Sequence, residues 1–503
     1  MRNKKFFYNG ILLSLVGFAM RAVAIFLGAY VLGAIGAEGI GLQGLITTVY
    51  AFAVTFATSG VSLSVTRLVA ASIGAGGTGE RVLRAAFLYA TLFGTAATTL
   101  LLSLAGVIGR GVLLDARAID AIKILALSLL PIALSSVISG YFVAVRRVTL
   151  NAAVQVLGQI MRIALTVILL TRAEHGDVQS AMRALAFSAA ITEGVCFLLA
   201  LIEYFFDRRA YRSLTVKGYD FGSVAGMALP LAFSAYVRSF LMSLEHSLIP
   251  KRLVDRGNTR AEALSSYGYL SGMALPIILF PMTPLSSFSG LLVPEFAECE
   301  AAGEKGRMER IATRASSLTV LYAVAVAVFI FAFSEELGYV IYGTYEAGQY
   351  VAILAPVIPL MYLDHVTDSM LKGIGEHVFS MWVNIIDALL SVVLVWLLIP
   401  IFDVFGYALV IISMEMFNFT LSFLRLRQRV KFRLNFTRST ALPLSVAVVA
   451  VFCTKRAFAI SGSTVSAVWL VSEIAFAASL FIGTILLFRI SDEIADGCKR
   501  KNK

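Results

Sequence analysis

The chain has 503 residues, of which 59% are hydrophobic and only 15% are charged, and its net charge is +11. A soluble protein of this length would need more charged residues to cover its surfaces, and a disordered or collagen-like chain would be much less apolar. The charge does not indicate nucleic-acid binding, because no basic soluble segment is long enough to form a separate domain.

Fourteen apolar runs follow one another along the chain, each long enough to cross a bilayer as a helix. They lack the strict two-residue alternation of a membrane β-barrel, and helices satisfy their own backbone hydrogen bonds in lipid. The sequence therefore predicts an all-α polytopic membrane protein with fourteen transmembrane helices. The predicted spans are residues 7–32, 42–65, 84–109, 120–143, 150–171, 183–205, 222–246, 265–293, 315–334, 349–371, 379–400, 404–424, 440–459 and 465–488.

The distribution of Lys and Arg predicts the orientation of these spans. With the N-terminus placed in the cytoplasm, roughly two-thirds of the cations fall in connections on the cytoplasmic side. Arg2, Lys4 and Lys5 precede the first span, which we interpret as retained, and a basic tail ending at Lys503 follows the last. We therefore predict that both termini are cytoplasmic.

Polar landmarks within the spans indicate an internal duplication. The same offset separates Asn151 from Ser380 and Gln155 from Asn384, in predicted spans 5 and 11. Internal repeats are common in transporters. We predict an N-terminal six-helix lobe over residues 1–215, a second six-helix lobe over residues 216–430, and two extra helices with a basic tail over residues 431–503.

Four cations lie inside predicted spans: Arg21, Lys123, Arg162 and Arg238. A charge near the bilayer centre is costly and usually faces a cavity or an oppositely charged partner. Guanidinium groups bind phosphate oxygens in a bidentate manner and stay charged when dehydrated. The three arginines therefore fit a cavity for an anionic substrate such as a pyrophosphate, and an ion pair with a neighbouring helix is the alternative for each.

Gln155 and Gln159 share one helix face with Arg162. A polar stripe on an otherwise apolar helix faces the protein interior or water rather than lipid. Amide groups would suit sugar hydroxyls as hydrogen-bond partners, and hydrogen bonds between helices are an equally good interpretation.

Carboxylates also lie within the spans. Asp364 and Asp368 are one helical turn apart, His365 is adjacent, and Glu245 follows Arg238 by two turns. Buried carboxylates can take up protons, so Glu245, Asp364, His365 and Asp368 are candidates for ion coupling, with compensation of the arginines as the alternative. Further acids in spans 6, 11 and 12 are Glu193, Asp387 and Glu415.

Prolines predict kinks in three spans, because proline removes an internal hydrogen bond of the helix. They are Pro230 in span 7, Pro276, Pro281 and Pro284 in span 8, and Pro356 and Pro359 in span 10. Such bends can act as hinges for alternating access or remain static.

The chain carries no Walker motif and no Cys or His spacing typical of zinc or redox sites. We therefore expect no cofactor, no metal and no catalytic residues. A membrane glycosyltransferase or polysaccharide polymerase usually needs a sizeable loop domain, and the longest connection predicted outside, residues 247–264, is too short for one.

Several stretches together resemble the stage V sporulation protein B group of the multidrug/oligosaccharidyl-lipid/polysaccharide (MOP) exporter superfamily. The resemblance covers most of the chain in order. Its residues are Gly39–Leu45, Ala57–Ala70, Leu248–Leu253, Tyr267–Pro276, Leu292–Glu295, Met370–Glu376 and Asn384–Asp387.

The resemblance implies two six-helix lobes around a central cavity in a bacterial inner-membrane protein. It implies flipping of undecaprenyl-pyrophosphate-linked oligosaccharides, with lipid II as one candidate. We expect a monomer, with coupling to Na⁺, H⁺ or the membrane potential. Arg21 matches an arginine position of the lipid II flippases in this superfamily, whereas a second arginine expected six residues later is Leu27. A multidrug/cation antiporter of the same fold and a non-transporting scaffold for cell-wall or spore-coat assembly are the alternatives.

Overall fold

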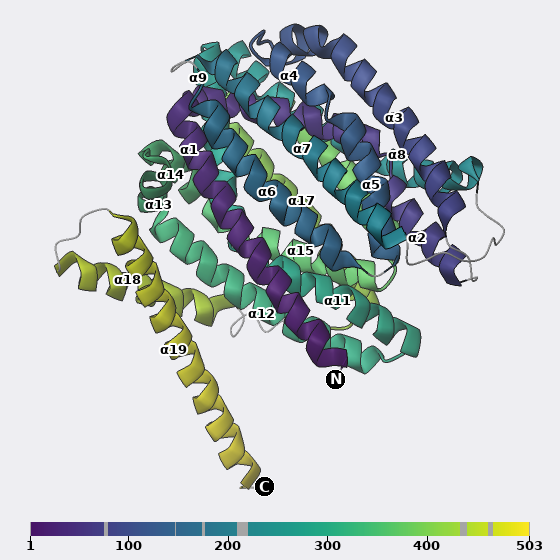
Figure 1. The fold of residues 1–503 in the computed structure, drawn as a ribbon. Helices are drawn as coiled ribbons and strands as arrows, with labels where there is room; N and C mark the ends of the chain where they lie inside the picture. Colours follow the sequence, from purple (N-terminus) through teal and green to yellow (C-terminus); the bar gives the residue numbers. More distant parts are fainter. Residues whose placement is uncertain are drawn as a thin grey trace. The chain divides into compact units, whose positions relative to one another are not determined.

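The computed structural model describes residues 2–74, 79–145, 147–173, 177–208, 220–432, 440–460 and 466–501. Every regular element in these residues is a helix (Figure 1). By length and hydropathy, ten helices could cross a membrane, or up to 13 if each of three bent pairs is one crossing. The all-α polytopic class is thus confirmed for the described residues, and the count of fourteen stays a prediction.

The chain divides into two compact units. Unit 1 contains Met1–Ala29, Tyr269–Ser391 and Val404–Lys503, and unit 2 contains Tyr30–Gly268 and Val392–Asp403. The predicted six-helix lobes stay a prediction, since the proposed boundary at residue 215 falls outside the described residues.

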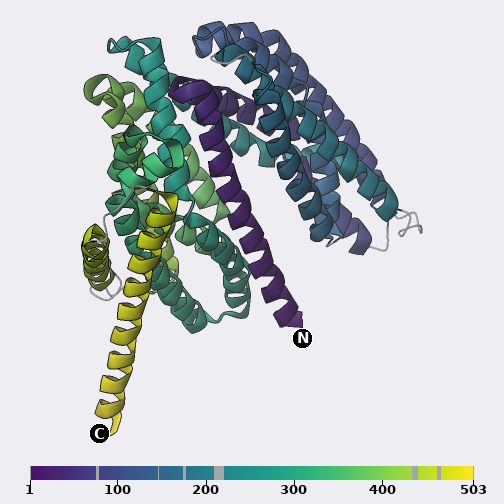
Figure 2. The same ribbon diagram turned by 60° about the vertical axis from the view of Figure 1, so that its left-hand side comes forward.

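The first two predicted spans are joined in one helix, α1 (Arg2–Thr58), instead of being separated by a loop. Gly36 alone leaves helical geometry (φ 67°, ψ 178°), so a single left-handed residue makes the bend that is visible in Figure 2. With 57 residues, α1 would extend about 85 Å, more than twice the hydrocarbon thickness of a bilayer. It is therefore long enough for two crossings.

The second predicted span, residues 42–65, is also interrupted, because two residues separate the end of α1 at Thr58 from the start of α2 (Val61–Gly74). Ser59 and Gly60 both have positive φ angles, of 46° and 69°. A Cβ atom at Gly60 would lie 2.9 Å from the carbonyl oxygen of Ala228, so the close approach of α8 (Phe221–Asp255) requires glycine there.

Unit 2 is built from helices that pack along their length. After α2 come α3 (Glu80–Val107), η1 (Ile108–Val112), α4 (Ala118–Ala126), α5 (Leu129–Ala144), α6 (Val148–Leu170), α7 (Val178–Arg208), α8 (Phe221–Asp255) and α9 (Arg260–Tyr267). α5 packs against α2, α3 and α7, and α6 lies beside α7 (Figure 1). Gly140 permits the α2–α5 contact, since a Cβ atom there would lie 2.5 Å from the carbonyl oxygen of Ser62.

Unit 1 is organised around α15 (Ile358–Gly373), which packs against α11, α12 and α17. Its other helices are η2 (Gly268–Ala274), α10 (Leu275–Leu279), α11 (Met282–Ala302), α12 (Lys305–Ala332), α13 (Ser334–Tyr342), α14 (Tyr345–Leu354), η3 (Ala355–Val357), α17 (Val404–Arg429), α18 (Leu442–Ile460) and α19 (Ala467–Lys501). Helix α16 (His377–Phe402) contributes residues to both units.

The bends predicted at proline residues are confirmed in two of the three spans, whereas Tyr345–Gly373, which holds Pro356 and Pro359, is one candidate crossing without such a bend. Helix α8 bends by 43° after Pro230, and Arg260–Leu279 meets Met282–Ala302 at 60°, next to Pro281. The short 3₁₀ segment η3 contains Pro356 and separates α14 from α15. A further bend of 41° separates α4 from α5, within the run 120–143 that the sequence predicts as one uninterrupted span.

Ion pairs between connections agree with the predicted alternation of sides. Pairs that join two segments predicted outside are Glu38–Arg117, Asp120–Arg183, Arg256–Asp403 and Glu336–Lys455. Pairs that join two segments predicted inside are Arg147–Asp207 and Glu376–Arg425. Partners in an ion pair must lie at the same end of their helices, so these contacts support the order of crossings that the cations predict.

Candidate functional site

The predicted substrate-binding residues are divided between the two units. Arg21 belongs to unit 1, whereas Gln155, Gln159, Arg162 and Arg238 belong to unit 2. The predicted ion-coupling residues are divided in the same way, with Glu245 in unit 2 and Asp364, His365 and Asp368 in unit 1. Each group is described within its own unit.

One face of α6 carries Gln155, Gln159 and Arg162, at positions one and two turns apart. The side chains of Gln155 and Arg162 are exposed and that of Gln159 is half-buried. The same face packs on α7 one turn beyond Arg162, where the hydroxyls of Thr166 and Ser188 lie 3.0 Å apart. The polar stripe therefore runs from accessible side chains at Gln155 and Arg162 to a buried contact with α7 at Thr166.

Arg162 has a charged neighbour. Glu193 on α7 interacts electrostatically with Arg162, and both interact with Tyr50 on α1. The Tyr50 hydroxyl lies 2.6 Å from Ser128 Oγ, at the break between α4 and α5. The ion-pair alternative therefore has a specific carboxylate for Arg162.

Arg238 is positioned by hydrogen bonds on either side of it along α8. Thr55 Oγ1 donates to Ser239 Oγ at 3.3 Å. The Ser59 hydroxyl contacts the hydroxyl of Tyr236, and it lies 2.9 Å from the hydroxyl of Tyr89. These bonds join α8 to the end of α1, and the Arg238 side chain itself is exposed.

Arg21 lies on the part of α1 that belongs to unit 1. The Phe18 ring packs against Phe280, with ring centroids 4.5 Å apart, next to the proline-induced bend between α10 and α11. Arg21 is half-buried and close enough to Tyr362 of α15 to interact with it electrostatically. Within the described residues of their own units, neither Arg21 nor Arg238 forms an ion pair with a carboxylate.

The predicted ion-coupling residues differ in their surroundings. Asp368 forms an ion pair with Lys372 one turn further along α15, at 2.6 Å, and His365 interacts with both. Glu245 is half-buried on α8. Asp364 interacts electrostatically with two other carboxylates, Asp368 and Asp387, and more weakly with Lys372.

Three carboxylates from three helices meet inside unit 1. Asp364 of α15 interacts electrostatically with Asp387 of α16, and Glu415 of α17 interacts with both. The sequence pattern indicated Asp364 as a candidate for ion coupling, but it did not indicate Asp387 or Glu415. Acids in spans 11 and 12 were visible in the sequence, but nothing in their spacing shows that these three helices converge.

Polar side chains on α17 accompany this acidic cluster, defined as Asp364, Asp387 and Glu415. Ser422 of α17 hydrogen-bonds to Asp364, whose Oδ1 atom is buried without a hydrogen-bond partner among the described residues. The Oδ1 atom of Asn418, also on α17, is likewise buried without a hydrogen-bond partner among the described residues. Among the described residues, no three His, Cys, Asp or Glu side chains are arranged to hold a metal ion.

Charged clusters also hold the ends of the helices. Burial would raise the pKa of Asp115, but hydrogen bonds from the side chain and backbone N–H of Arg117 lower it below its ordinary value. In unit 1, hydrogen bonds from Arg425 lower the pKa of Glu376, against the effect of burial, and Arg429 adds to the lowering. These carboxylates are therefore ionised structural partners.

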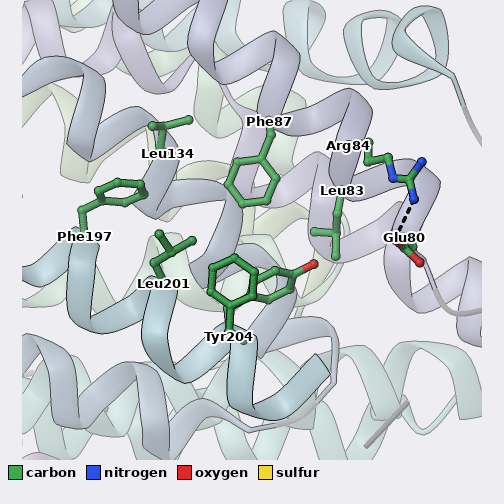
Figure 3. A pocket seen from close by; sticks show the side chains of 9 residues that line it. Glu80, Leu83, Arg84, Phe87, Leu134, Phe197, Leu201 and Tyr204 are labelled. Carbon is green, nitrogen blue, oxygen red and sulfur yellow. Dashed lines mark hydrogen bonds and ion pairs between the residues drawn. The ribbon is translucent and has the colours of Figure 1, made fainter. Parts of the chain in front are cut away.

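A hollow of about 320 Å³ lies within unit 2 among α3, α5 and α7. Figure 3 shows that its wall is mainly apolar, with Phe87, Phe197 and Leu201 around it and Arg84 at one end. Arg84 forms an ion pair with Glu80 at 2.8 Å. The hollow does not suit a pyrophosphate or a sugar, because this cation is neutralised and the described lining includes none of the predicted substrate-binding residues.

Comparison with protein families gives two matches. The family model described as polysaccharide biosynthesis protein matches residues 6–300. The model described as MatE matches residues 257–397.

Two curated proteins of Bacillus subtilis (strain 168) are similar in sequence. Stage V sporulation protein B is 25% identical over 390 residues, which cover 75% of this chain and 75% of that protein. Sporulation protein YkvU is 22% identical over 47% of this chain and 54% of that protein.

Solved structures share the fold at low sequence identity. The lipid II flippase MurJ in an inward closed conformation matches with a TM-score of 0.72 over 96% of this chain and 100% of that chain, at 14% identity. A multidrug resistance MATE family transporter of the MOP superfamily, in an inward-facing conformation, matches with a TM-score of 0.63 over 83% and 98%, at 16% identity.

Proposed function

Because this chain belongs to the polysaccharide biosynthesis protein family, we propose that it is a flippase that translocates an undecaprenyl-pyrophosphate-linked oligosaccharide across the bacterial plasma membrane. Its similarity to stage V sporulation protein B and the fold it shares with the lipid II flippase MurJ support this proposal. The protein would work as a monomer by alternating access, without catalysing a covalent reaction.

The observation that carries the proposal is the pair Arg21 and Arg238. Both lie well inside predicted spans, and neither forms an ion pair with a carboxylate in the described residues of its own unit. An uncompensated guanidinium in a membrane-spanning helix needs water or an anionic ligand. A pyrophosphate would meet that need through bidentate hydrogen bonds.

The remaining predicted residues have supporting roles in this proposal. Gln155 and Gln159 would hydrogen-bond sugar hydroxyls, because their amides can both donate and accept. Arg162 would add positive charge weakened by Glu193. The polyprenyl tail would stay among the lipids, where it loses no apolar contact.

The acidic cluster supports a proposal for ion coupling. Carboxylates that share a buried space repel one another, and binding of H⁺ or Na⁺ relieves this repulsion. Asp364 would therefore act together with Asp387 and Glu415 rather than with Asp368, which Lys372 already neutralises.

The test is translocation of a lipid-linked oligosaccharide in liposomes that contain the purified protein. We expect Arg21→Ala and Arg238→Ala each to lower the rate by at least about tenfold, since a lost charge-assisted hydrogen bond costs roughly 1.5–3 kcal/mol. Lys123→Ala is the matched control, because it removes an exposed cation within a predicted span that has no assigned role. Wild-type rates for both arginine variants would refute the assignment.

A multidrug/cation antiporter is the second candidate, and the MatE match to residues 257–397 favours it. A cationic drug would be repelled by uncompensated arginines and attracted by carboxylates. Export of a cationic dye by the same liposomes, with no translocation of the lipid-linked glycan, would establish this candidate over the flippase.

A further inference from the structure

A groove of about 460 Å³ lies between the N-terminal turns of α12 and the residues that follow α17, entirely within unit 1. Arg310, Thr313, Arg314 and Ser317 line it from α12, and Lys431 lines it from the other side. The sequence accounts for these cations only as anchors on the cytoplasmic side. Their arrangement around one groove is a property of the fold.

The α12 residues form a single stripe along the helix. Their spacing of three, four and seven residues places them on one face. The stripe begins in the connection predicted to be cytoplasmic and reaches Ser317, inside the predicted span 315–334. Leu318, one turn beyond Arg314, is 38% exposed, so the polar stripe continues directly into an apolar surface.

The cations of this groove are not compensated, in contrast to a neighbouring arginine. Arg307 forms ion pairs with Glu295, Glu298 and Glu304 at 2.6, 3.4 and 3.1 Å. No carboxylate in the described part of the chain pairs with Arg310, Arg314 or Lys431. Glu309 also lines the groove, which leaves an excess of positive charge.

We propose that this groove binds the headgroup of an anionic phospholipid from the leaflet on its side of the membrane. The two guanidinium groups and Lys431 would surround the phosphate, and the hydroxyls of Thr313 and Ser317 would donate hydrogen bonds. Basic pockets between helices at the cytoplasmic surface are suited to such headgroups. The exposed Leu318 favours a lipid over a soluble phosphate, because an acyl chain can cover it.

The test is lipid binding to the purified full-length protein, measured by native mass spectrometry with phosphatidylglycerol and with phosphatidylcholine. Each cation near a membrane surface contributes roughly a fivefold gain in affinity for anionic lipid. We therefore expect Arg310→Gln/Arg314→Gln to weaken phosphatidylglycerol binding by roughly 25-fold and to leave phosphatidylcholine binding unchanged. Equal melting temperatures of the variant and the wild type in phosphatidylcholine nanodiscs will show that the variant is folded.

Arg427→Gln is the control, because Arg427 is an exposed cation at the same end of unit 1 that does not line the groove. It should retain wild-type binding of phosphatidylglycerol. The proposal is overturned if the double variant binds this lipid like the wild type, or if Arg427→Gln loses as much affinity for phosphatidylglycerol as the double variant does. It is also overturned if inorganic phosphate displaces the lipid at equal concentration, since the ligand would then be a free anion.

Discussion

At the scale of single residues, the arginines within predicted spans differ in whether a carboxylate lies close enough to interact with them. Glu193 is close enough to Arg162 to interact with it, whereas Arg21 and Arg238 have no such partner in the described residues of their units. A charge that is already compensated contributes to stability, and an uncompensated one is available for a ligand.

This difference predicts the outcome of a double-mutant cycle. Arg162→Gln and Glu193→Gln should each lower the free energy of unfolding. The double variant should lose less stability than the sum of the two single losses, with a coupling energy of roughly 0.5–3 kcal/mol. The measurement is thermal unfolding in detergent. Strict additivity would show that the two groups do not interact.

A second residue-scale prediction concerns the acidic cluster. Because Glu415 lies among like charges, Glu415→Gln removes repulsion and should stabilise the folded protein by about 1 kcal/mol. The same variant should weaken the dependence of transport on the ion gradient. Asp368→Asn is the contrasting control, since it breaks the ion pair with Lys372 and should not stabilise. A lower melting temperature for Glu415→Gln would contradict the repulsion.

At the scale of elements, the kink in α1 depends on one residue. Gly36 has a φ of +67°, and a Cβ atom there would have nothing within 4 Å. Gly36→Ala should therefore cost roughly 1–3 kcal/mol through backbone strain alone, because its combination of positive φ and extended ψ is essentially restricted to glycine. Gly33→Ala, three residues earlier, is the matched control, since its Cβ atom would also have open space and Gly33 has no positive φ. Equal melting temperatures for the two variants would contradict the positive φ angle of Gly36.

The connection between α15 and α16 gives a prediction with a pH dependence. Arg425 and Arg429 lower the pKa of Glu376 below its ordinary value of 4.5. The contribution of Glu376 to stability is therefore complete above that ordinary value and is lost as the pH falls toward the lower pKa of the folded state.

Glu376→Gln should accordingly lower the melting temperature at neutral pH, and the gap to the wild type should shrink below about pH 4.5. Thermal unfolding of both proteins across this range measures the effect. A gap that widens on acidification would show that the carboxylate is not held in its ionised form.

At the scale of the whole molecule, the order and orientation of the crossings can be tested together. Asn258 lies in a connection predicted outside and Gln428 in one predicted inside. In a chain freed of its native cysteines, Asn258→Cys should react with a membrane-impermeant thiol reagent in intact cells. Gln428→Cys should react only after the cells are opened. The reverse pattern would invert the orientation, and labelling of both in intact cells would contradict the number of crossings between them.

The sequence by itself determined the class of the protein. Apolar runs of bilayer length can only be helices in lipid, and the cations between them predict sides that ion pairs such as Glu38–Arg117 and Glu376–Arg425 support. The proline bends were predictable because proline acts within its own helix. The break at Ser59 and Gly60 was not, since it depends on how closely Ala228 approaches.

The tertiary structure alone decided which charges have partners. Asp387 and Glu415 join Asp364, Glu193 lies near Arg162, and Lys431 lies across a groove from Arg310, although each pair is far apart in the sequence. Periodicity reports which face of a helix a residue occupies, but it does not report which helix lies opposite that face. Electrostatic energy depends on the distance between charges, and packing between helices sets that distance.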